Sequence, residues 1–320
     1  MKILLSLMAF LPLLTCAQTP AWKPDKAVEL VIGAAPGGAN DRIGRTLQRL
    51  LQDGRVNTVN VINKPGGGQS VAFAYLNTHP GNPHYLGLAS SSWLTTVAAG
   101  RGTLTPRELS PILKLLDEYQ VYFVKADSPI TSAPDIVERL RKDPASLSFG
   151  FSTAAGNPLH ISIGEIARRA GADPTKIKAV VFNSGTDTAI QVAGGHLDVG
   201  LQSPGSALQL TQSGKLRFIG VAGPRRHAGL LANVPTMREQ GVDVIANVFY
   251  TVFAPKGVDA AQLAFWDDAL TNVMRSESLK KDLDINFWTV DLIHHRELPA
   301  FLEKELEGYR RTLSALGMAK

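Results

Sequence analysis

Cysteine is almost absent from this sequence, and its absence removes several kinds of chemistry. The single cysteine, Cys16, lies in the apolar N-terminal segment of a 320-residue chain. If that segment is removed on export, the mature protein has no thiol, which excludes structural disulfides, thiol catalysis and cysteine-based metal sites. Long apolar runs are also missing, because nothing after residue 20 is long and apolar enough to cross a bilayer.

Concentrated charge of one sign is absent as well. The formal net charge is +5, and it becomes +4 when Lys2 is removed with the N-terminal segment. Lys and Arg are dispersed among acidic residues, and no basic run is interleaved with aromatic side chains. The sequence therefore predicts a mildly basic, solvated surface and no nucleic-acid partner.

The motifs of several common enzyme classes are missing. No Lys follows the glycine-rich stretch 33–38 as a nucleotide-triphosphate loop requires, and neither G-x-G-x-x-G nor G-x-S-x-G is present. The seven histidines include no H-E-x-x-H, and the neighbours His294 and His295 are expected to face different ways. We predict no metal, no cofactor and no catalytic residue, although spacing alone leaves open a hydrolase with dispersed Ser, His and Asp.

Residues 1–17 have the composition of a secretory signal peptide. Lys2 supplies a short basic region, and an apolar stretch of the usual length leads to small residues and Ala17. The stretch is too short for a membrane span, so we predict cleavage after Ala17 and a periplasmic location. The alternatives are a buried N-terminal helix and a lipoprotein anchored at Cys16. Thr15 argues against the lipoprotein, because it is larger than the residue that usually precedes a lipid-modified cysteine.

Apolar strands alternate with glycine-rich loops and helical patterns along the chain. In the clearest unit, an apolar strand at residues 30–32 leads into the stretch 33–38, and a helix starts near Asn40. Asn40 is the expected N-cap, with Asp41 in the first turn. Similar units begin near residues 59, 85, 147, 179 and 199. The alternation predicts an α/β architecture with two mostly parallel sheets flanked by helices.

Two further apolar strands are candidate crossings between domains. One covers residues 118–124 and the other residues 247–257. A set of strand–loop–helix units lies between them, so we predict a middle domain inserted into the first. The expected division is a first lobe of residues 18–118 plus 248–320 and a second lobe of residues 119–247. The C-terminal remainder is predicted to be mainly helical.

The loops at the carboxyl ends of the expected strands are rich in Gly, Ser, Thr and Asn. Ligands of open α/β sheets bind at this edge, where helix N-termini present free N–H groups to anions. At least four such termini follow Gly38, Gly68, Gly156 and Gly185. Because main-chain and hydroxyl donors satisfy a carboxylate without Lys or Arg, the loops predict a carboxylate site. The alternative is that they are ordinary tight turns with glycine for geometry alone.

Seven segments carry a resemblance to a known family. They are PGGANDRIGRTLQ, VINKPGGGQSVAFAYLNTHPG, VKADSPITSAPDIVERLRKDP, FGFSTAAGNPLHISIGEIARRAG, VVFNSGTDTAIQVAGGHLDVG, LANVPTMREQGVDV and FAPKG. In this order they resemble the substrate-binding proteins of tripartite tricarboxylate transporters, the TctC or Bug family. The match covers nearly the whole mature chain. It departs at residues 81–86, where many relatives carry P-D-G-Y-T-L, and at residues 181–185, where many carry V-P-Y-K-G. The second departure lies in the expected pocket and leaves the ligand open.

The resemblance implies a two-lobed periplasmic binding protein of the type II-like architecture, with a hinge of two crossing strands. Such a protein closes on a small di- or tricarboxylate, gripped by backbone amides and ordered water, for delivery to a membrane transporter. By motif match, the ligand-binding residues expected in the first lobe are Ala35, Gly37, Gly38, Asn40, Asp41, Gly67, Gly68, Gln69, Ser91 and Ser92. Those expected in the second lobe are Thr153, Ala154, Gly156, Asn157, His160, Ser184, Gly185, Asp187 and Gln202.

Three of these positions have a competing structural role. Asp41 is a carboxylate beside an anion site, and it is expected to cap its own helix rather than to meet the ligand. Asp187 has the same ambiguity. His160 follows Asn157 and Pro158 in the first turn of a helix, where it either contacts the ligand or packs.

The sequence thus predicts a monomeric periplasmic solute-binding protein, not an enzyme. Its expected partners are a small organic acid and the subunits of a membrane transporter. One alternative is a sensory binding protein that reports to a membrane signalling partner. The other is a periplasmic enzyme that acts on small carboxylates, and the lack of an activated nucleophile or a metal cluster in the sequence disfavours it.

Overall fold

The structure is a computed structural model that describes residues 22–102 and 104–318. The predicted signal peptide, residues 1–17, lies outside the described residues. The strands are β1 (Val28–Ile32), β2 (Val59–Asn63), β3 (Tyr85–Ser90), β4 (Leu109–Tyr119), β5 (Val121–Lys125), β6 (Ser148–Ser152), β7 (Lys178–Phe182), β8 (Val199–Gln202), β9 (Leu216–Val221), β10 (Asn247–Pro255) and β11 (Trp288–His294). The α-helices are α1 (Ala39–Asp53), α2 (Ser70–Asn77), α3 (Ser91–Ala98), α4 (Ala133–Lys142), α5 (Pro158–Arg169), α6 (Gly185–Ala193), α7 (Pro204–Gln212), α8 (Ala260–Met274), α9 (Glu277–Asn286) and α10 (Leu298–Ala315). Short 3-10 helices are η1 (Gly67–Gln69), η2 (Pro106–Glu108), η3 (Pro174–Lys176) and η4 (Gly229–Leu231).

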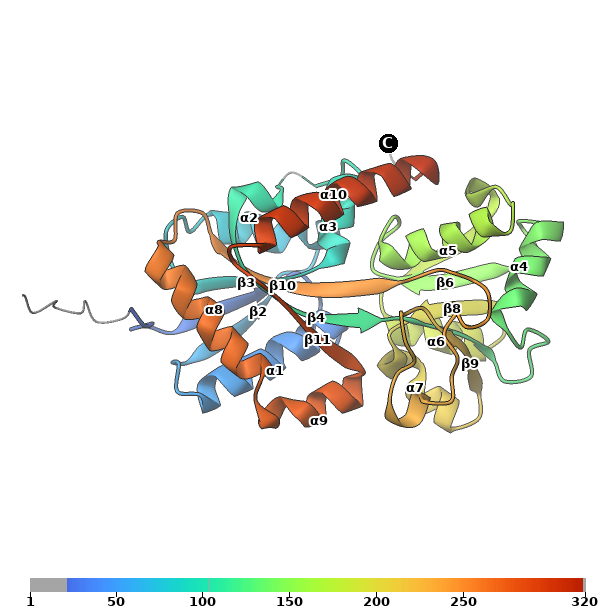
Figure 1. The fold of residues 1–320 in the computed structure, drawn as a ribbon, viewed down its shortest axis with the longest axis horizontal. Helices are drawn as coiled ribbons and strands as arrows, with labels where there is room; N and C mark the ends of the chain where they lie inside the picture. Colours follow the sequence, from blue (N-terminus) through green and yellow to red (C-terminus); the bar gives the residue numbers. More distant parts are fainter. Residues whose placement is uncertain (1–21, 103, 319–320) are drawn as a thin grey trace, which may run out of the picture.

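Two lobes are each built around one sheet that helices flank (Figure 1). One sheet has the strand order β11-β4-β10-β3-β1-β2, and the other has the order β7-β6-β8-β5-β9. We call the lobe that contains β1 the first lobe and the lobe that contains β6 the second lobe. The expected α/β fold with two lobes is confirmed.

The sheets are mixed, so the expectation of mostly parallel sheets was wrong. β1 runs parallel to β2 and β3, and β6 runs parallel to β7 and β8. The pairings of β4, β5, β10 and β11 are antiparallel. The reason is the route of the chain, because a segment that leaves a lobe and a neighbouring segment that returns must run in opposite directions.

The crossing consists of β4, which continues through Gln120 into β5, and of β10, which returns the chain to the first sheet (Figure 1). Three backbone hydrogen bonds tie the crossing segments together. Gln120 N donates to Ala246 O at 3.0 Å, Ala246 N donates to Ala222 O at 3.0 Å, and Ala222 N donates to Gln120 O at 2.8 Å. The junction therefore joins three chain segments by main-chain bonds.

The N-cap of the first helix lies two residues earlier than the sequence pattern indicates. Gly38 is the N-cap of α1, in an extended conformation with φ −76° and ψ 175°, so Asn40 is not the cap as expected. The amide of Asn40 instead donates to Gln69 Oε1 at 3.1 Å in the buried interior. Asn40 therefore forms a hydrogen bond with a residue distant in the sequence instead of capping the helix as local preference predicts.

The C-terminal part is mainly helical, as expected, but residues Trp288–His294 form the strand β11 at the edge of the first sheet, which was not predicted. The expectation that His294 and His295 face different ways was also wrong. His294 Nδ1 lies 2.6 Å from Asp267 Oδ1, and His295 Nδ1 contacts Oδ2 of the same carboxylate. His294 ends the strand and His295 follows it in a turn, so the alternation of a strand does not separate their side chains.

The lobes also touch outside the crossing strands. A small apolar cluster combines Ala99 after α3, Ile161 of α5, and Leu313 and Leu316 at the end of α10. The C-terminal end of α10 therefore packs against the second lobe, although the helix lies mainly along the first (Figure 1). This contact between the lobes is stabilised by the burial of apolar side chains and not by charge.

Close packing in the second lobe gives a test of the fold. A Cβ at Gly200 in β8 lies 2.2 Å from Cε2 and 2.3 Å from Cζ of the buried Phe123 ring. We expect Gly200→Ala to lower the free energy of unfolding by about 1–3 kcal/mol, because the rigid ring must move. Gly205→Ala is the control, since a Cβ there has nothing within 4 Å and alanine favours the helix. Urea unfolding of both variants measures the difference, and equal stabilities contradict this packing.

Candidate functional site

The carboxyl ends of the parallel strands in the two lobes point toward each other. β3 pairs antiparallel with β10 and places Ser90 opposite Tyr250, three residues from the start of the returning strand at Asn247. β8 pairs antiparallel with β5 and places Gln202 opposite Val121, which directly follows the crossing. β1, β2, β6 and β7 run parallel to these strands, so the helix N-termini that follow them gather between the lobes.

In the first lobe, the buried side chain of Gln69 joins the loops. Gln69 Oε1 accepts from Asn40 Nδ2 at 3.1 Å and from Ser90 N at 3.0 Å, while Gln69 Nε2 donates to Ser90 Oγ at 2.6 Å. Gln69 is 2% exposed and has a φ of +79°, a left-handed conformation that costs energy for a residue other than glycine. The hydrogen bonds therefore hold a strained residue where the ends of α1, α2 and α3 meet.

Asp41 stabilises the glycine-rich loop of its own lobe. Asp41 Oδ2 accepts from Gly37 N and from Arg45 Nε, both at 2.9 Å, and Oδ1 accepts from Asn63 Nδ2 at 2.9 Å. Burial alone raises the pKa of this carboxyl, but the hydrogen bonds from Arg45, Gly37 and Asn63 outweigh it and hold the pKa below its ordinary value. The carboxylate is thus ionised and occupied by protein donors, as a structural role requires.

Main-chain donors of the first lobe lack side-chain caps. No side chain caps the N-terminus of α1 at Gly38 or that of α3 at Ser90. The same holds for α2, which starts directly after Gln69. Ser91 and Ser92 form the first turn of α3 and are buried. Uncapped N-termini expose N–H groups and the positive end of the helix dipole, which together favour an anion.

In the second lobe, the buried side chain of Gln202 joins the loops as Gln69 does in the first lobe. Gln202 Oε1 accepts from Ser152 Oγ at 3.0 Å, and Gln202 Nε2 donates to Thr188 Oγ1 at 3.0 Å. Thr188 Oγ1 in turn donates to Ser184 O at 3.2 Å. The glutamine is 4% exposed, and its bonds connect the ends of β6 and β8 with the first turns of α6. Each lobe therefore uses one buried glutamine to fix its loops.

Helix α5 begins at a capped end. Asn157 Oδ1 accepts from His160 N at 3.0 Å, and Asn157 Nδ2 donates to Ser152 O at 2.7 Å. Similarly, Ser184 Oγ caps α6 by accepting from Asp187 N at 3.1 Å. The exposed side chain of Asp187 contributes no part of that cap. These caps leave fewer free N–H groups in the second lobe than in the first.

His160 is a neutral donor in the second lobe. Its ring is partly buried and stacks on Phe151 with ring centroids 4.8 Å apart. Burial and, to a smaller extent, the charge of Arg101 lower the pKa of His160 to about 4. His160 Nδ1 accepts from Gly156 N at 3.0 Å, so the neutral ring carries its proton on Nε2. The ring then offers one N–H donor without a charge.

The lowered pKa of His160 predicts a pH dependence of stability. Between pH 6.5 and 5.0 the unfolded chain binds a proton at this position that the folded chain does not, so stability falls as the pH falls. The loss through this residue is about 2 kcal/mol over that interval. His160→Asn keeps an acceptor for Gly156 N but does not titrate. Urea unfolding at both pH values should show wild type losing about 2 kcal/mol more than the variant, and equal losses contradict the assignment.

The remaining expected site residues lie on the loops themselves. Ala35, Gly37 and Gly67 are exposed, while Gly68 is half-buried and has a φ of +58°. A Cβ at Gly68 lies 2.3 Å from Thr96 Oγ1, so only glycine fits there. In the second lobe Thr153 is exposed, Ala154 is half-buried, and Gly156 is buried; Gly185 packs against Gln202. These positions lie in or directly beside the loops that follow the carboxyl ends of β1, β2, β6 and β7.

Two arginines beside these loops were not predicted from the sequence. Arg101 Nη1 donates to Ala155 O at 3.0 Å, a direct hydrogen bond between the lobes. Arg42, in the first turns of α1, is partly buried beside the loop, and its Nη1 donates to Gly37 O at 3.3 Å. Neither arginine has an acidic partner within 4.0 Å among the described residues. A positive charge in the first turns of a helix, where acidic residues are favoured, was the available sequence signal for Arg42.

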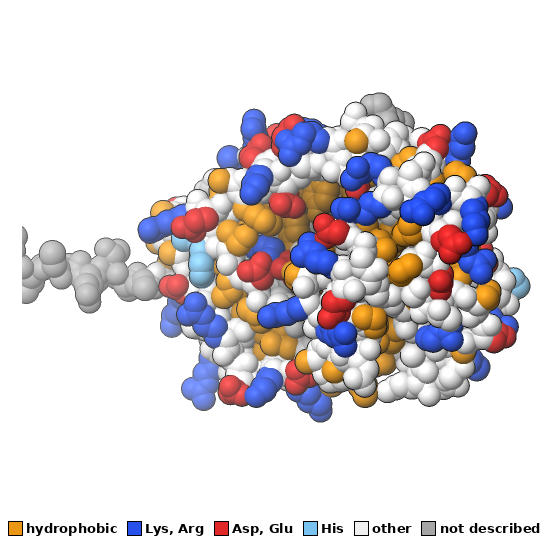
Figure 2. Space-filling model, turned by 45° about the vertical axis from the view of Figure 1, so that its right-hand side comes forward, with side chains coloured by type: hydrophobic (Ala, Val, Ile, Leu, Met, Phe, Trp, Pro, Cys, Tyr) orange, Lys and Arg blue, Asp and Glu red, His pale blue; other side chains and the backbone are white. Residues whose placement is uncertain are grey.

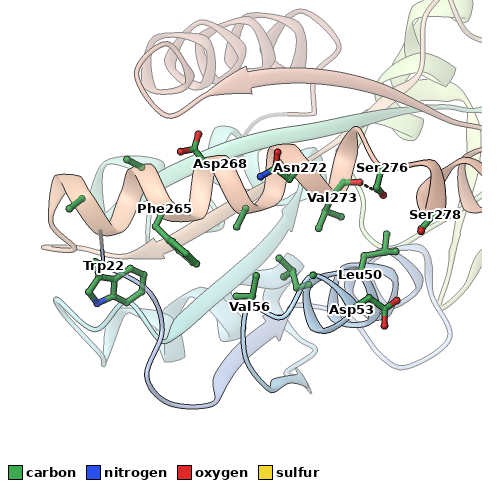
Figure 3. A pocket seen from close by; sticks show the side chains of 15 residues that line it. Trp22, Leu50, Asp53, Val56, Phe265, Asp268, Asn272, Val273, Ser276 and Ser278 are labelled. Carbon is green, nitrogen blue, oxygen red and sulfur yellow. Dashed lines mark hydrogen bonds between the residues drawn. The ribbon is translucent and has the colours of Figure 1, made fainter. Parts of the chain in front are cut away.

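The rest of the surface differs from this region. Lys, Arg, Asp and Glu are interspersed over the face in Figure 2. A hollow of about 740 Å³ lies on the first lobe between α1 and α8, away from the carboxyl ends of the strands. Figure 3 shows it with Trp22 and Phe265 at one end and Ser278 toward the other. Its lining is mainly apolar and contains none of the expected ligand-binding residues.

Within residues 22–102 and 104–318, no helix combines the length and apolarity that a membrane span needs. Over the same residues, no group of three or more His, Cys, Asp or Glu side chains has an arrangement that suits a metal ion.

Residues 43–317 match the family model TctC, which is described as the tripartite tricarboxylate transporter family receptor. A Cupriavidus necator protein, "UPF0065 protein in gbd 5'region", is 25% identical over 306 residues, 95% of this chain and 92% of the relative. Protein BugT of Bordetella pertussis (strain Tohama I) is 23% identical over 261 residues, 80% of this chain and 78% of the relative.

Solved structures share the fold. A Rhodopseudomonas palustris structure described as "R. palustris Rpa4515 with adipate" has a TM-score of 0.81 at 20% identity, covering 92% of this chain and 99% of that chain. MatC from Rhodopseudomonas palustris, with bound malate, has a TM-score of 0.74 at 17% identity, covering 91% of this chain and 99% of that chain. At these identities the likeness concerns the architecture.

Proposed function

We propose, since the chain belongs to the TctC family of tripartite tricarboxylate transporter receptors, that it captures a small organic acid between its two lobes. The ligand is a di- or tricarboxylate that is released unchanged to a membrane transporter. The family consists of receptors, so the membership gives no support to the alternative of an enzyme. The solved relatives that carry adipate and malate support this class of ligand.

One observation carries the proposal. The N-termini of α1, α2 and α3 have no side-chain caps, and their strands point toward the second lobe. Free N–H groups at helix N-termini bind carboxylate oxygens, and they are worth more where water is excluded. The second lobe adds the neutral Nε2–H of His160 and the hydroxyl-rich loops that Gln202 holds.

The site residues we propose are those that the loops of both lobes present to the region between them. Gly38, Asn40, Ser91 and Ser92 supply the first lobe's part, with Ala35, Gly37, Gly67, Gly68 and Gln69 shaping its loops. Gly156, Asn157, His160, Ser184 and Gly185 supply the second lobe's part, with Thr153, Ala154, Asp187 and Gln202 beside them. Asp41 acts through the loop, because protein donors occupy both of its oxygens.

We further propose that the lobes, residues 18–118 with 248–320 and residues 119–247, move relative to each other on binding. A ligand that contacts both lobes stabilises the closed arrangement by the difference in its contacts between the two states. The monomeric chain acts in the periplasm after removal of residues 1–17. Its partners are the membrane subunits of the transporter, and a signalling partner in their place is the remaining alternative.

The test is a thermal-unfolding screen of the mature protein against small carboxylates, with the corresponding amides and alcohols as controls. At about a thousand times its dissociation constant, a ligand adds about 4 kcal/mol to the stability of the folded state. For a chain of this size the unfolding temperature should then rise by several degrees. Recovery of the carboxylate unchanged supports a receptor, and its conversion supports an enzyme. No shift with any carboxylate, in protein first freed of bound ligand by unfolding and refolding, contradicts the proposal.

A further inference from the structure

Arg42 breaks a local rule of helix design at the edge of the proposed site. It is the fourth residue of α1, close to the positive end of the helix dipole. A cation there is disfavoured, whereas acidic residues are favoured. Positions that violate such rules without a local compensation are commonly functional. The compensation for Arg42 is therefore to be sought among the groups around its guanidinium.

The protein itself leaves this guanidinium without an acidic partner. No Asp or Glu oxygen of the described residues lies within 4.0 Å of it. Asp41, its neighbour in the chain, is fully engaged by Gly37, Arg45 and Asn63. The protein contact of the guanidinium is a long hydrogen bond of 3.3 Å from Nη1 to Gly37 O, and Nε is shielded from solvent without an acceptor.

A buried acid that the charge of Arg42 influences is also occupied by protein donors. Glu118, at the end of β4 beside the crossing, is 2% exposed, and the positive charge of Arg42 acts on it. Glu118 Oε2 accepts from Tyr250 Oη at 3.0 Å and Oε1 accepts from Trp288 Nε1 at 3.2 Å. The guanidinium of Arg42 therefore contacts the Gly33–Gly38 loop and has no acidic partner within 4.0 Å among the described residues.

We propose that Arg42 determines specificity by binding a second anionic group of the ligand, so that this receptor selects dianions over monoanions. The inference rests on the proposed function and adds a role that uncapped helix ends do not supply. Helix N-termini and the His160 donor hold one carboxylate through neutral groups. The guanidinium presents several N–H donors in one plane and carries a full positive charge. It can therefore form charged hydrogen bonds with the second carboxylate of the ligand.

The test compares two ligand pairs in wild type and variants by isothermal titration. The pairs are adipate with its monoamide and malate with its 4-monoamide, in which only the far charge is removed. Wild type should bind a dianion about 10- to 100-fold more tightly than its monoamide. Arg42→Met should lower dianion affinity by the same factor and leave monoamide affinity unchanged, and Arg42→Lys should retain part of the preference.

Arg49→Met is the matched control. It removes one positive charge from the same helix, but Arg49 pairs with Asp282 at 2.6 Å on the surface. This variant should keep the wild-type preference. If wild type binds each dianion and its monoamide equally, or if Arg42→Met weakens both by one factor, the role of Arg42 is refuted and the carboxylate receptor stands. If wild type binds none of the four compounds, the proposal for Arg42 fails, and the wider carboxylate screen then decides whether the receptor proposal fails with it.

Discussion

Replacing Glu118 by alanine should lower the free energy of unfolding by about 3–5 kcal/mol. The carboxyl is buried and joins three strands, because it accepts from Tyr250 of β10 and Trp288 of β11 while it belongs to β4 itself. Its removal leaves buried donors without acceptors and opens a cavity beside the crossing. Urea unfolding at pH 7 measures the effect.

Glu118→Gln is the control for this prediction. Burial raises the pKa of Glu118, against the opposing effects of Arg42 and its hydrogen bonds, and an amide has nearly the shape of the protonated acid. Glutamine keeps an acceptor for Trp288 Nε1 and can turn its NH₂ group toward Tyr250 Oη. We expect it to cost about 1 kcal/mol. A Glu118→Ala variant as stable as Glu118→Gln contradicts the structural role of this network.

Replacing Gln69 by alanine should both destabilise the fold and weaken binding of the carboxylate. The change removes the acceptor of Asn40 Nδ2 and Ser90 N and the donor to Ser90 Oγ, all in the buried interior. The cost is about 3 kcal/mol, and the freed loops lower the affinity for the best carboxylate about tenfold or more. Urea unfolding and isothermal titration measure the two effects.

Gln48→Ala is the matched control in the same lobe. Gln48 Nε2 donates to Val59 O at 2.7 Å on the body of α1, away from the gathered helix ends. Its removal should cost about 1 kcal/mol and leave the affinity unchanged. If Gln69→Ala binds as tightly as Gln48→Ala, the glutamine does not organise the site.

Periodicity and loop composition predict much of this fold because they follow which side chains are buried in the core and which are exposed. The pattern predicts a mainly helical C-terminal remainder, as observed, and it finds the strands that precede α1, α5 and α6. It fails at β11, where Trp288–His294 pairs with β4 at the sheet edge. That pairing depends on a partner about 170 residues away, which no local window contains. The antiparallel share of the sheets was missed for the same reason, since it follows from the route between lobes.

The composition of the loops was predicted better than the contacts of individual residues. The Gly, Ser and Asn loops do gather between the lobes, because parallel strands share one carboxyl edge. A structural role for Asp41 was foreseen from the repulsion between two carboxylates, but the expected capping of its own helix was wrong. The carboxylate instead accepts from Gly37 N, Arg45 and Asn63, and Asn63 lies on another loop. Asn40 was assigned to a local cap, and only the fold shows that Gln69 takes its amide. The bond from Arg101 to Ala155 had no sequence signal.

Hydrogen–deuterium exchange, with and without the tightest carboxylate of the screen, tests most directly whether the ligand lies between the lobes. Slower exchange is expected in both lobes at once, at residues 33–41 and 90–93 of the first and at residues 152–160 and 184–187 of the second. The hollow between α1 and α8 should be unchanged. Protection confined to one lobe, or centred on Trp22, Phe265 and α8, contradicts capture between the lobes.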